Sequence, residues 1–267
     1  MENIERAFAR MGARAKMVED SRVTLDVKND RAGEYFEIRL APGTELVPLE
    51  VKAADRHLLL LTRDGEEKAR FLCGHDERSW FVAAIPESEP VSTVAGAMDA
   101  LKPELVRDRQ RSVPTKLRQK RRNPASIRQG EWFFVPAPYL SVDSLLVLRH
   151  EPFTRSDGGT PHMAEEAYRR GGETVHLPQV PRRDAELVES NPELANGLTD
   201  KEHAAFLKAH PKARYWGWNV MRRNPEMFVR GRITHRDHKT VVLRGWHQVL
   251  MNTEPRAKAR AKVVFLD

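Results

Sequence analysis

Six short runs of β-branched, aromatic and leucine residues within the first 85 residues constrain the fold of this chain most. Polar turns separate them, such as Asp64-Gly65 and the GHDE stretch at 74–77. The runs cover 22–28, 34–40, 46–52, 56–63, 68–73 and 78–85. Short strands joined by polar turns predict a small antiparallel sheet or barrel. Two helices are expected beside it, over 3–16 and over 91–105, the second with Ser92 or Thr93 as its cap.

The residues after 128 mix strand and helix patterns. Apolar runs predict strands over 131–138, 142–149, 227–235, 240–250 and 258–266. Two helices are expected in the same region, over 160–172 and 198–210. Thr160 as N-cap and Pro161 at the first position favour the first helix. Thr199 and Glu202 have the spacing of a capping box for the second.

A basic tract lies between these two regions. Residues 107–128 contain nine basic residues and one acid, Asp108, which gives this tract a charge of +8. The net charge of the whole chain is +7, so the rest of the chain sums to about −1. The basic residues are Arg107, Arg109, Arg111, Lys116, Arg118, Lys120, Arg121, Arg122 and Arg128. Pro114 and Pro124 interrupt the tract, which has no helical or strand periodicity and therefore predicts a linker.

The combined patterns predict an α+β protein. We expect two strand-rich regions of mainly antiparallel sheet with a few short helices, joined by the basic linker. The predicted boundaries are 1–103 for the first region, 104–128 for the linker and 129–267 for the second.

The leading hypothesis for function follows from this local charge. A cluster of basic residues is typical of a surface that contacts nucleic acid phosphates, so we expect a non-catalytic binding or accessory protein. The sequence holds no RNP motif, zinc finger, Walker loop, G-x-G-x-x-G or G-x-S-x-G pattern. A protein-interaction module, whose basic tract only keeps the chain in solution, is a further alternative.

Composition places the protein among globular proteins of a reducing compartment. Hydrophobic residues make up 40% and charged residues 31% of the chain, and Cys73 is the single cysteine. The first residues lack the apolar segment of a secretory signal, and no apolar run approaches the ~20 residues of a membrane span. We therefore expect a cytoplasmic protein without a membrane partner.

The stretch GRITHRDHKTVVLRGWHQVL, residues 231–250, raises the question of a metal site. A regular hairpin with its turn at 236–239 pairs Val229 with Trp246, which puts His235 and His247 on opposite faces and far apart. The tip retains His235, Asp237 and His238, ligand types that suit zinc or iron.

Two interpretations of this tip stay open. One is a polar turn in which Asp237 bonds its own backbone. The other is a zinc-type site in a metal-dependent hydrolase, a nuclease being one form of it, with a further ligand from the other region.

Other polar and aromatic groups have structural interpretations. Cys73 near His75 is expected to be a buried apolar side chain, and His162 with its following glutamates to be an exposed helix face. Trp132 to Phe134 are expected in the core.

Three stretches carry a resemblance to a known family: FLCGHDERSWFVAAIP, RQGEWFFVP and VRGRITHRDHKTVVLRGWHQVLMNTE. Through them the chain resembles a bacterial and phage-associated family of uncharacterised proteins, over most of its length. The resemblance implies a bacterial or phage source and carries over no activity, cofactor or catalytic residue.

Overall fold

The structure of the chain is a computed structural model that describes residues 2–155, 160–254 and 263–265. The fold is α+β, with several mainly antiparallel sheets and a few short helices, which confirms the predicted class. The chain divides into two compact units. The first contains Met1–Pro136, Arg236–Lys239 and Leu250–Ala257, and the second contains Ala137–His235, Thr240–Val249 and Lys258–Asp267. The boundaries predicted from the sequence remain predictions.

The two sheets β1–β3–β2 and β4–β5–β6–β7 of the first unit contain the six predicted strands and one more, β1. One sheet has the order β4–β5–β6–β7, with strands Glu45–Lys52 (β4), His57–Asp64 (β5), Glu67–Asp76 (β6) and Ser79–Ala84 (β7). The other has the order β1–β3–β2, with strands Ala15–Glu19 (β1), Thr24–Asp30 (β2) and Gly33–Leu40 (β3). Strand β1 pairs parallel with β3, whereas the other pairs of these two sheets are antiparallel. A short 3-10 helix, Ala53–Asp55 (η1), precedes β5.

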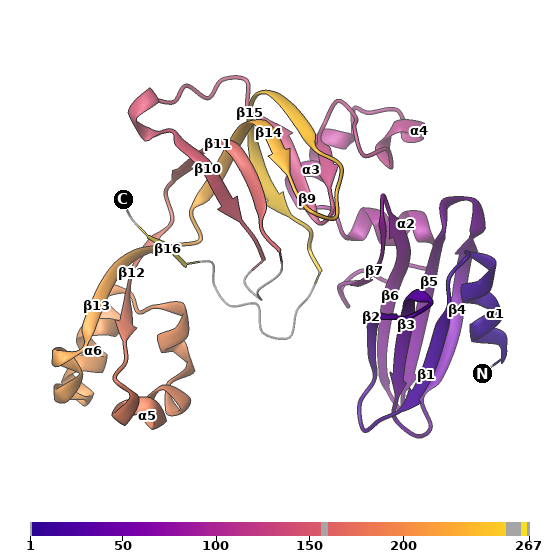
Figure 1. Ribbon diagram of the computed structural model, residues 1–267, viewed down its shortest axis with the longest axis horizontal. Coiled ribbons are helices and arrows are strands. Elements are labelled where there is room, and N and C mark those ends of the chain that lie inside the picture. Colours follow the sequence, from indigo (N-terminus) through magenta and orange to yellow (C-terminus); the bar gives the residue numbers. More distant parts are fainter. Residues whose placement is uncertain (1, 156–159, 255–262, 266–267) are drawn as a thin grey trace. The chain divides into compact units, whose positions relative to one another are not determined.

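Helix α1 (Glu2–Arg10) lies beside the strands of this unit and supplies part of its core (Figure 1). Phe8 is fully buried, and its ring centroid lies 4.8 Å from that of Phe36 on β3. Leu58 of β5 belongs to the same core. The predicted helix is confirmed but ends earlier than expected, because Gly12 adopts a φ of +80°, the left-handed conformation that commonly terminates a helix.

The opposite side of β5 packs against helix α2 (Val94–Ala100). Leu59 of β5 lies in one buried cluster with Val94 and Ala97 of the helix. Strand β5 therefore buries both of its faces, as its four consecutive leucines require. The side chain of Thr93 accepts a hydrogen bond of 3.1 Å from the backbone of Gly96, so Thr93 is the predicted cap.

The basic tract is folded, and its expected lack of regular structure is wrong. It contains helices Glu104–Gln110 (α3) and Thr115–Arg118 (α4) and ends in the hairpin of Ile127–Gln129 (β8) with Trp132–Pro136 (β9). The two helices have only seven and four residues, too few to show a periodic pattern. Pro103 and Pro114 precede them, in the position that begins a helix without needing an N–H donor.

A segment from near the far end of the chain completes the first unit. Thr253 donates hydrogen bonds to the backbone carbonyls of Leu101 (3.1 Å) and Ala100 (2.7 Å). The carboxylate of Glu254 accepts one of 3.1 Å from the backbone of Ala84. Residues distant in sequence therefore cooperate in one core.

The main sheet of the second unit is antiparallel. Its strands follow the order β10–β11–β14–β15, with bounds Leu148–Phe153 (β10), His162–Arg170 (β11), Glu226–Thr234 (β14) and Val241–Met251 (β15). A 3-10 helix, Ser144–Leu146 (η2), occupies the start of the run expected as a strand over 142–149.

Strand β11 corrects the helix predicted over 160–172. The prediction relied on the local cap signals of Thr160 and Pro161 at the start of the segment. In the structure, β11 pairs with β10 on one side and β14 on the other, so its backbone groups are satisfied by the sheet. Ala164 and Ala167 are buried on either side of a bulge. Pairing on both edges outweighs the weak helical preference of the sequence.

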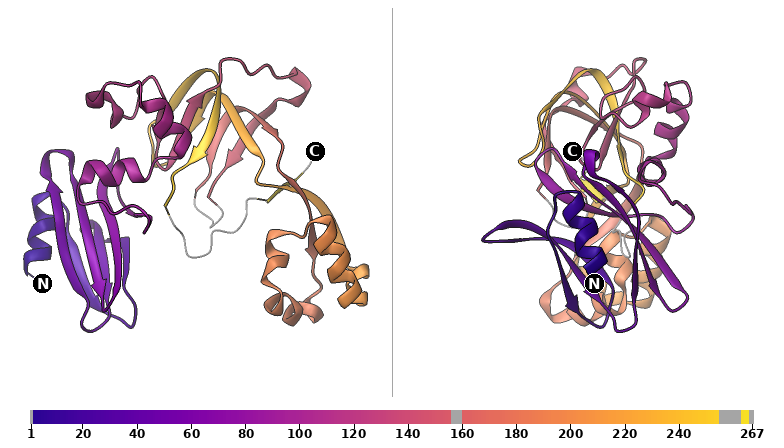
Figure 2. Two further views of the ribbon diagram at one scale, coloured as in Figure 1. Left: turned by 180° about the vertical axis from the view of Figure 1, so that it is seen from behind. Right: turned by 90° about the vertical axis from the view of Figure 1, so that its right-hand side faces the viewer.

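A smaller part of the second unit, residues 173–223 and 263–265, forms what we call the helical lobe (Figure 2). Its strands are Glu173–Gln179 (β12), Gly217–Arg223 (β13) and Val263–Phe265 (β16), the described part of the strand expected over 258–266. Its helices are Arg182–Asp184 (η3), Ala185–Ser190 (α5), Pro192–Asn196 (η4), Asp200–Ala209 (α6) and Pro211–Tyr215 (η5). Thr199 and Glu202 form the predicted capping box of α6, so this helix is confirmed. Phe206 and Trp216 are buried in the lobe's core.

Among the helices that the structure describes, none has the length and apolar character needed to cross a lipid bilayer.

Candidate functional site

The nine basic residues of 107–128 fall into an exposed and a partly buried group. Six are exposed to solvent: Arg107, Arg109, Arg111, Lys116, Lys120 and Arg122. The other three, Arg118, Arg121 and Arg128, are half-buried. The positive charge of the tract is therefore divided between the surface and the interior of the first unit.

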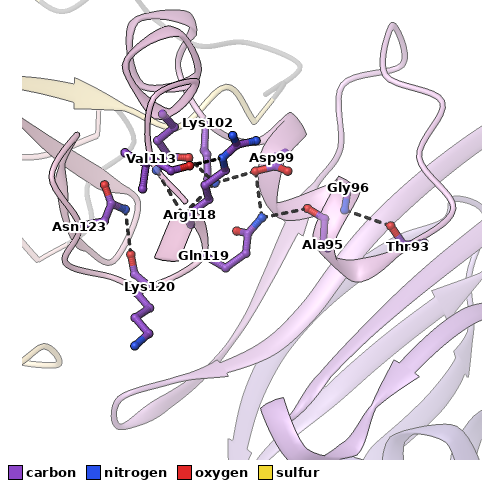
Figure 3. Close-up of polar contacts among 11 residues, drawn as sticks. Thr93, Ala95, Gly96, Asp99, Lys102, Val113, Arg118, Gln119, Lys120 and Asn123 are labelled. Atoms are coloured by element: carbon purple, nitrogen blue, oxygen red, sulfur yellow. Dashed lines mark hydrogen bonds and ion pairs between the residues drawn. The ribbon is translucent and has the colours of Figure 1, made fainter. Parts of the chain in front are cut away.

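Lys102 organises the tract from inside (Figure 3). Its buried ammonium donates to Asp99 Oδ1 at 2.6 Å, to Gln110 Oε1 at 2.7 Å and to the carbonyl oxygen of Arg118 at 3.1 Å. Burial lowers the pKa of Lys102, and the neighbouring carboxylate of Asp99 opposes that shift. These bonds connect α2, α3 and α4, so one buried cation fixes the geometry of the surrounding basic residues.

The guanidinium of Arg118 belongs to the same internal network. Its Nε donates to the carbonyl oxygen of Val113 at 2.8 Å, and its Nη2 donates to that of Arg111 at 3.2 Å. Gln119 donates to Asp99 Oδ1 at 2.9 Å and ties the end of α4 to α2 (Figure 3). Arg118 therefore holds the chain together rather than facing a ligand.

Arg121 and Arg128 meet two carboxylates at the turn between β6 and β7. Arg121 forms ion pairs with both Asp76 and Glu77. Arg128 Nη2 lies 3.5 Å from Asp76 Oδ1. Burial, and then the charge of Arg128, lower the pKa of Arg121 to about 10. Partly buried pairs of this kind neutralise their own charges, so these two arginines add little to a phosphate-binding surface.

The exposed group is itself divided. Arg107 pairs with Glu89 at 2.8 Å and Arg111 with Asp108 at 2.9 Å. Arg109 donates to the carbonyl oxygen of Pro136 at 2.7 Å.

Lys116, Lys120 and Arg122 make up what we call the α4 basic surface. In the part of the chain that the structure describes, none of the three forms an ion pair. They follow one another within a few residues, and the sequence has no acid between Arg109 and Gly130.

The tip of the histidine-rich hairpin, residues 236–239, belongs to the first unit. Arg78 donates to the carbonyl oxygen of Arg236 at 3.2 Å, and Gln129 donates to that of Lys239 at 2.7 Å. Glu77 accepts a hydrogen bond from the backbone of Lys239. Side chains far away in sequence therefore hold the backbone of this turn.

His238 sits in the same contact. Its Nδ1 lies 3.9 Å from Glu77 Oε2, and its ring lies against Gly130. A Cβ atom at Gly130 would come within 2.6 Å of His238 Nε2, and the φ of Gly130 is +58°. Only glycine satisfies both conditions without strain. Asp237 is half-buried in this turn.

His235 belongs to the second unit, where its neighbour is a histidine that the sequence interpretation assigned to a helix surface. The rings of His162 and His235 stack with centroids 4.1 Å apart, and His162 also stacks on Phe153 at 5.3 Å. His235 Nε2 lies 3.1 Å from the carbonyl oxygen of Thr160. His162 is buried, so the predicted exposed helix face is wrong. Residue spacing within the segment cannot indicate the burial of His162, because the strand that pairs with β11 lies elsewhere in the sequence.

The predicted register of the hairpin is wrong as well. A register shift spans the two residues from Val229 to Gly231 on β14 but the four from Leu243 to His247 on β15, so Val229 pairs with His247 instead of Trp246. Cross-strand partners share a face, so His247 lies on the side of Val229. Its Nδ1 lies 2.9 Å from the carbonyl oxygen of Gly245. His235 and His247 are nevertheless far apart along the strands, as predicted, because Ile233, near the tip, pairs with Val241.

Two other structural interpretations are confirmed. Cys73 is fully buried in the core of the first unit, and burial raises the pKa of its thiol, which opposes a reactive thiolate. His75 packs its ring edge-on against Trp80. Trp132, Phe133 and Phe134 are buried, as expected for a core strand.

Comparison with models of known families, with curated proteins and with solved structures finds no match for this chain. The geometry of the described residues is therefore the basis for a functional proposal.

Proposed function

We propose that the protein is a non-catalytic nucleic-acid-associated protein of the cytoplasm, which contacts phosphates through the α4 basic surface. The observation that carries the proposal is the accumulation of Lys116, Lys120 and Arg122, exposed and without ion pairs among the described residues. A basic side chain already paired with a carboxylate displaces few of the counterions condensed on the nucleic acid. An unpaired basic side chain contributes fully to binding. Folding of the tract around Lys102 supports the proposal further, because a fixed surface loses less conformational entropy on binding.

The test compares two triple variants with the same loss of charge. The first is Lys116→Gln, Lys120→Gln and Arg122→Gln in one chain. The matched control is Lys201→Gln, Lys208→Gln and Lys212→Gln, three exposed lysines of the second unit. Binding to labelled duplex DNA, single-stranded DNA and single-stranded RNA is followed by fluorescence anisotropy over a series of salt concentrations.

The first variant is expected to bind more weakly and to flatten the plot of log affinity against log salt by about 0.9 per lost contact on duplex DNA. The control is expected to behave like the parent protein. Equal binding by the parent and the first variant would remove the proposal and favour a protein-interaction module. We expect little sequence preference, since these residues lie in and after a four-residue helix that is too short to read a groove.

A metal-dependent hydrolase is the second candidate, and the stacked pair of His162 and His235 favours it. Together with His238 of the set predicted from the sequence, they would offer three imidazoles, a ligand type common in zinc sites. In this proposal His162 takes the place that the sequence interpretation gave to Asp237.

Metal content of the untagged protein, measured by mass spectrometry, separates the alternatives. His162→Ala, His235→Ala and His238→Ala are each expected to lose the metal, whereas Asp237→Asn and His247→Ala retain it. Metal lost with Asp237→Asn but retained with His162→Ala would restore the original ligand set. A metal-free parent, whose thermal stability a chelator leaves unchanged, would contradict the hydrolase candidate.

A further inference from the structure

A second pair of stacked histidines lies in the helical lobe. The rings of His176 on β12 and His203 on α6 are nearly parallel, with an interplanar angle of 16° and centroids 4.1 Å apart. His203 also contacts Trp218 of β13, at 4.2 Å between ring centroids. Helix α6 is therefore joined to the strands of its lobe through one imidazole stacked on another, and Figure 2 shows the helix beside these strands.

The two rings differ in how a positive charge on them would be compensated. His176 Nε2 lies 2.7 Å from Asp200 Oδ1, a carboxylate at the first turn of α6 that is 83% exposed. The Nε2 of His203 is buried and has no hydrogen-bond partner among the described residues. A proton on Nε2 of His176 therefore meets a carboxylate, whereas a proton on Nε2 of His203 meets no acceptor among the described residues.

The surrounding charges do not change this difference. From α6, Glu202 is engaged by Thr199 in the capping box. From β12 and β13, Glu173 and Arg223 pair with each other. His210, at the end of α6, lies against Phe206.

We infer that the stacked pair of His176 and His203 is a proton-operated latch, which holds α6 on β12 while both rings are neutral and loosens the helix in weak acid. The backbone of His176 is hydrogen-bonded to the segment just before α6, since His176 and Leu198 exchange two backbone hydrogen bonds. When both imidazoles are charged, like charges face each other at the stacking distance, and the rings separate.

The direction of the pH dependence follows from His203. Burial, and then the nearby His176, lower the pKa of His203 below its ordinary value of 6.5, while Asp200 opposes the shift. Folding thus favours the neutral ring. Its contribution to stability is fully present above pH ~6.5 and declines as the pH falls from there toward the lowered pKa, because the unfolded chain then binds more protons. Acid weakens the latch, and neutral pH restores it.

Hydrogen–deuterium exchange of the full chain at pH 7.5 and pH 5.0, corrected for the intrinsic effect of pH on exchange, tests the latch. In the parent, peptides covering α6 are expected to exchange at least several-fold faster at pH 5.0, while peptides covering β5 do not change. His203→Phe retains an aromatic ring without a titrating proton, so it should abolish the difference in α6. His210→Phe is the matched control, because it removes a histidine of the same helix outside the stack, and it should keep the acid response.

A second measurement needs no variant. The Cε1–H resonances of the labelled parent give the titration of each histidine by NMR, and His203 is expected to titrate below the ordinary value as the α6 signals shift or broaden. Exchange in α6 that is the same at both pH values, or that stays acid-sensitive in a folded His203→Phe protein, would overturn the inference. So would titration of His203 at its ordinary value.

Discussion

At the scale of single residues, neighbours in the basic tract have opposite roles. Arg121 pairs with Asp76 and Glu77, whereas the adjacent Arg122 is exposed. The sequence shows the charge of both residues but not the carboxylates that neutralise one of them, because those lie on a turn much earlier in the chain. Charge density therefore predicts that a basic surface exists, and only the tertiary contacts show which residues form it.

Lys102 offers the clearest test at this scale. Lys102→Met retains the volume of the aliphatic side chain but removes the donor for Gln110 Oε1, while the carbonyl oxygen of Arg118 keeps a hydrogen bond of 3.2 Å from Gln110 Nε2. Each buried acceptor left without a donor costs about 1–3 kcal/mol, so the free energy of unfolding of the first unit should fall by at least that amount. Urea denaturation measures the effect. Lys120→Met, at an exposed position of the same tract, should change stability by no more than about 0.5 kcal/mol.

At the scale of elements, local sequence signals predict a helix or strand correctly where the residues of that element determine its structure. The capping box of α6 and the six predicted strands of the first unit, β2 to β7, are confirmed. Strand β11 was not, since its identity depends on β10 and β14. Thr160 and Pro161 near its start resemble the N-terminus of a helix. Nothing within the segment indicates that two strands pair with it. The register shift between β14 and β15 is equally invisible, because Gly245, which lies within it at a φ of +80°, suits a turn or a bulge alike.

The two threonine caps make a matched pair of predictions. Thr93 caps α2, and Thr199 caps α6. Replacing either threonine with alanine removes one bond to an N-terminal amide and should cost about 1 kcal/mol. Hydrogen exchange should accelerate in α2 alone for Thr93→Ala and in α6 alone for Thr199→Ala. Equal acceleration of both helices in either variant would contradict a local role for the caps.

At the scale of the whole molecule, contacts between distant parts of the sequence decide what the candidate sites contain. The turn at 236–239 meets Arg78, Glu77 and Gln129, a contact that no spacing rule within either segment predicts. Similarly, Thr253 and Glu254 complete the first unit by bonding Leu101, Ala100 and Ala84.

A truncated chain tests the second of these contacts. A fragment of residues 1–136 lacks three hydrogen bonds of Thr253 and Glu254, each worth about 1 kcal/mol, as well as the bonds of the turn at 236–239. Its midpoint of urea denaturation should lie below that of the first unit in the full chain. Joining residues 250–254 to the fragment through a flexible linker should recover part of the difference. A fragment as stable as the intact unit would show that residues 250–254 do not contribute to the stability of the first unit.

The docking of residues 250–254 also bears on how the protein is made. A ribosome delivers the chain from its N-terminus at about 5–20 residues per second. The strands of the first unit therefore emerge well before the segment that completes them. During this interval the backbone groups of Ala84, Ala100 and Leu101 face water, and most of the second unit must be synthesised before their partners arrive. The first part of the protein to be synthesised is thus among the last to reach its final form, and a chaperone that binds nascent chains would find it open for all of that time.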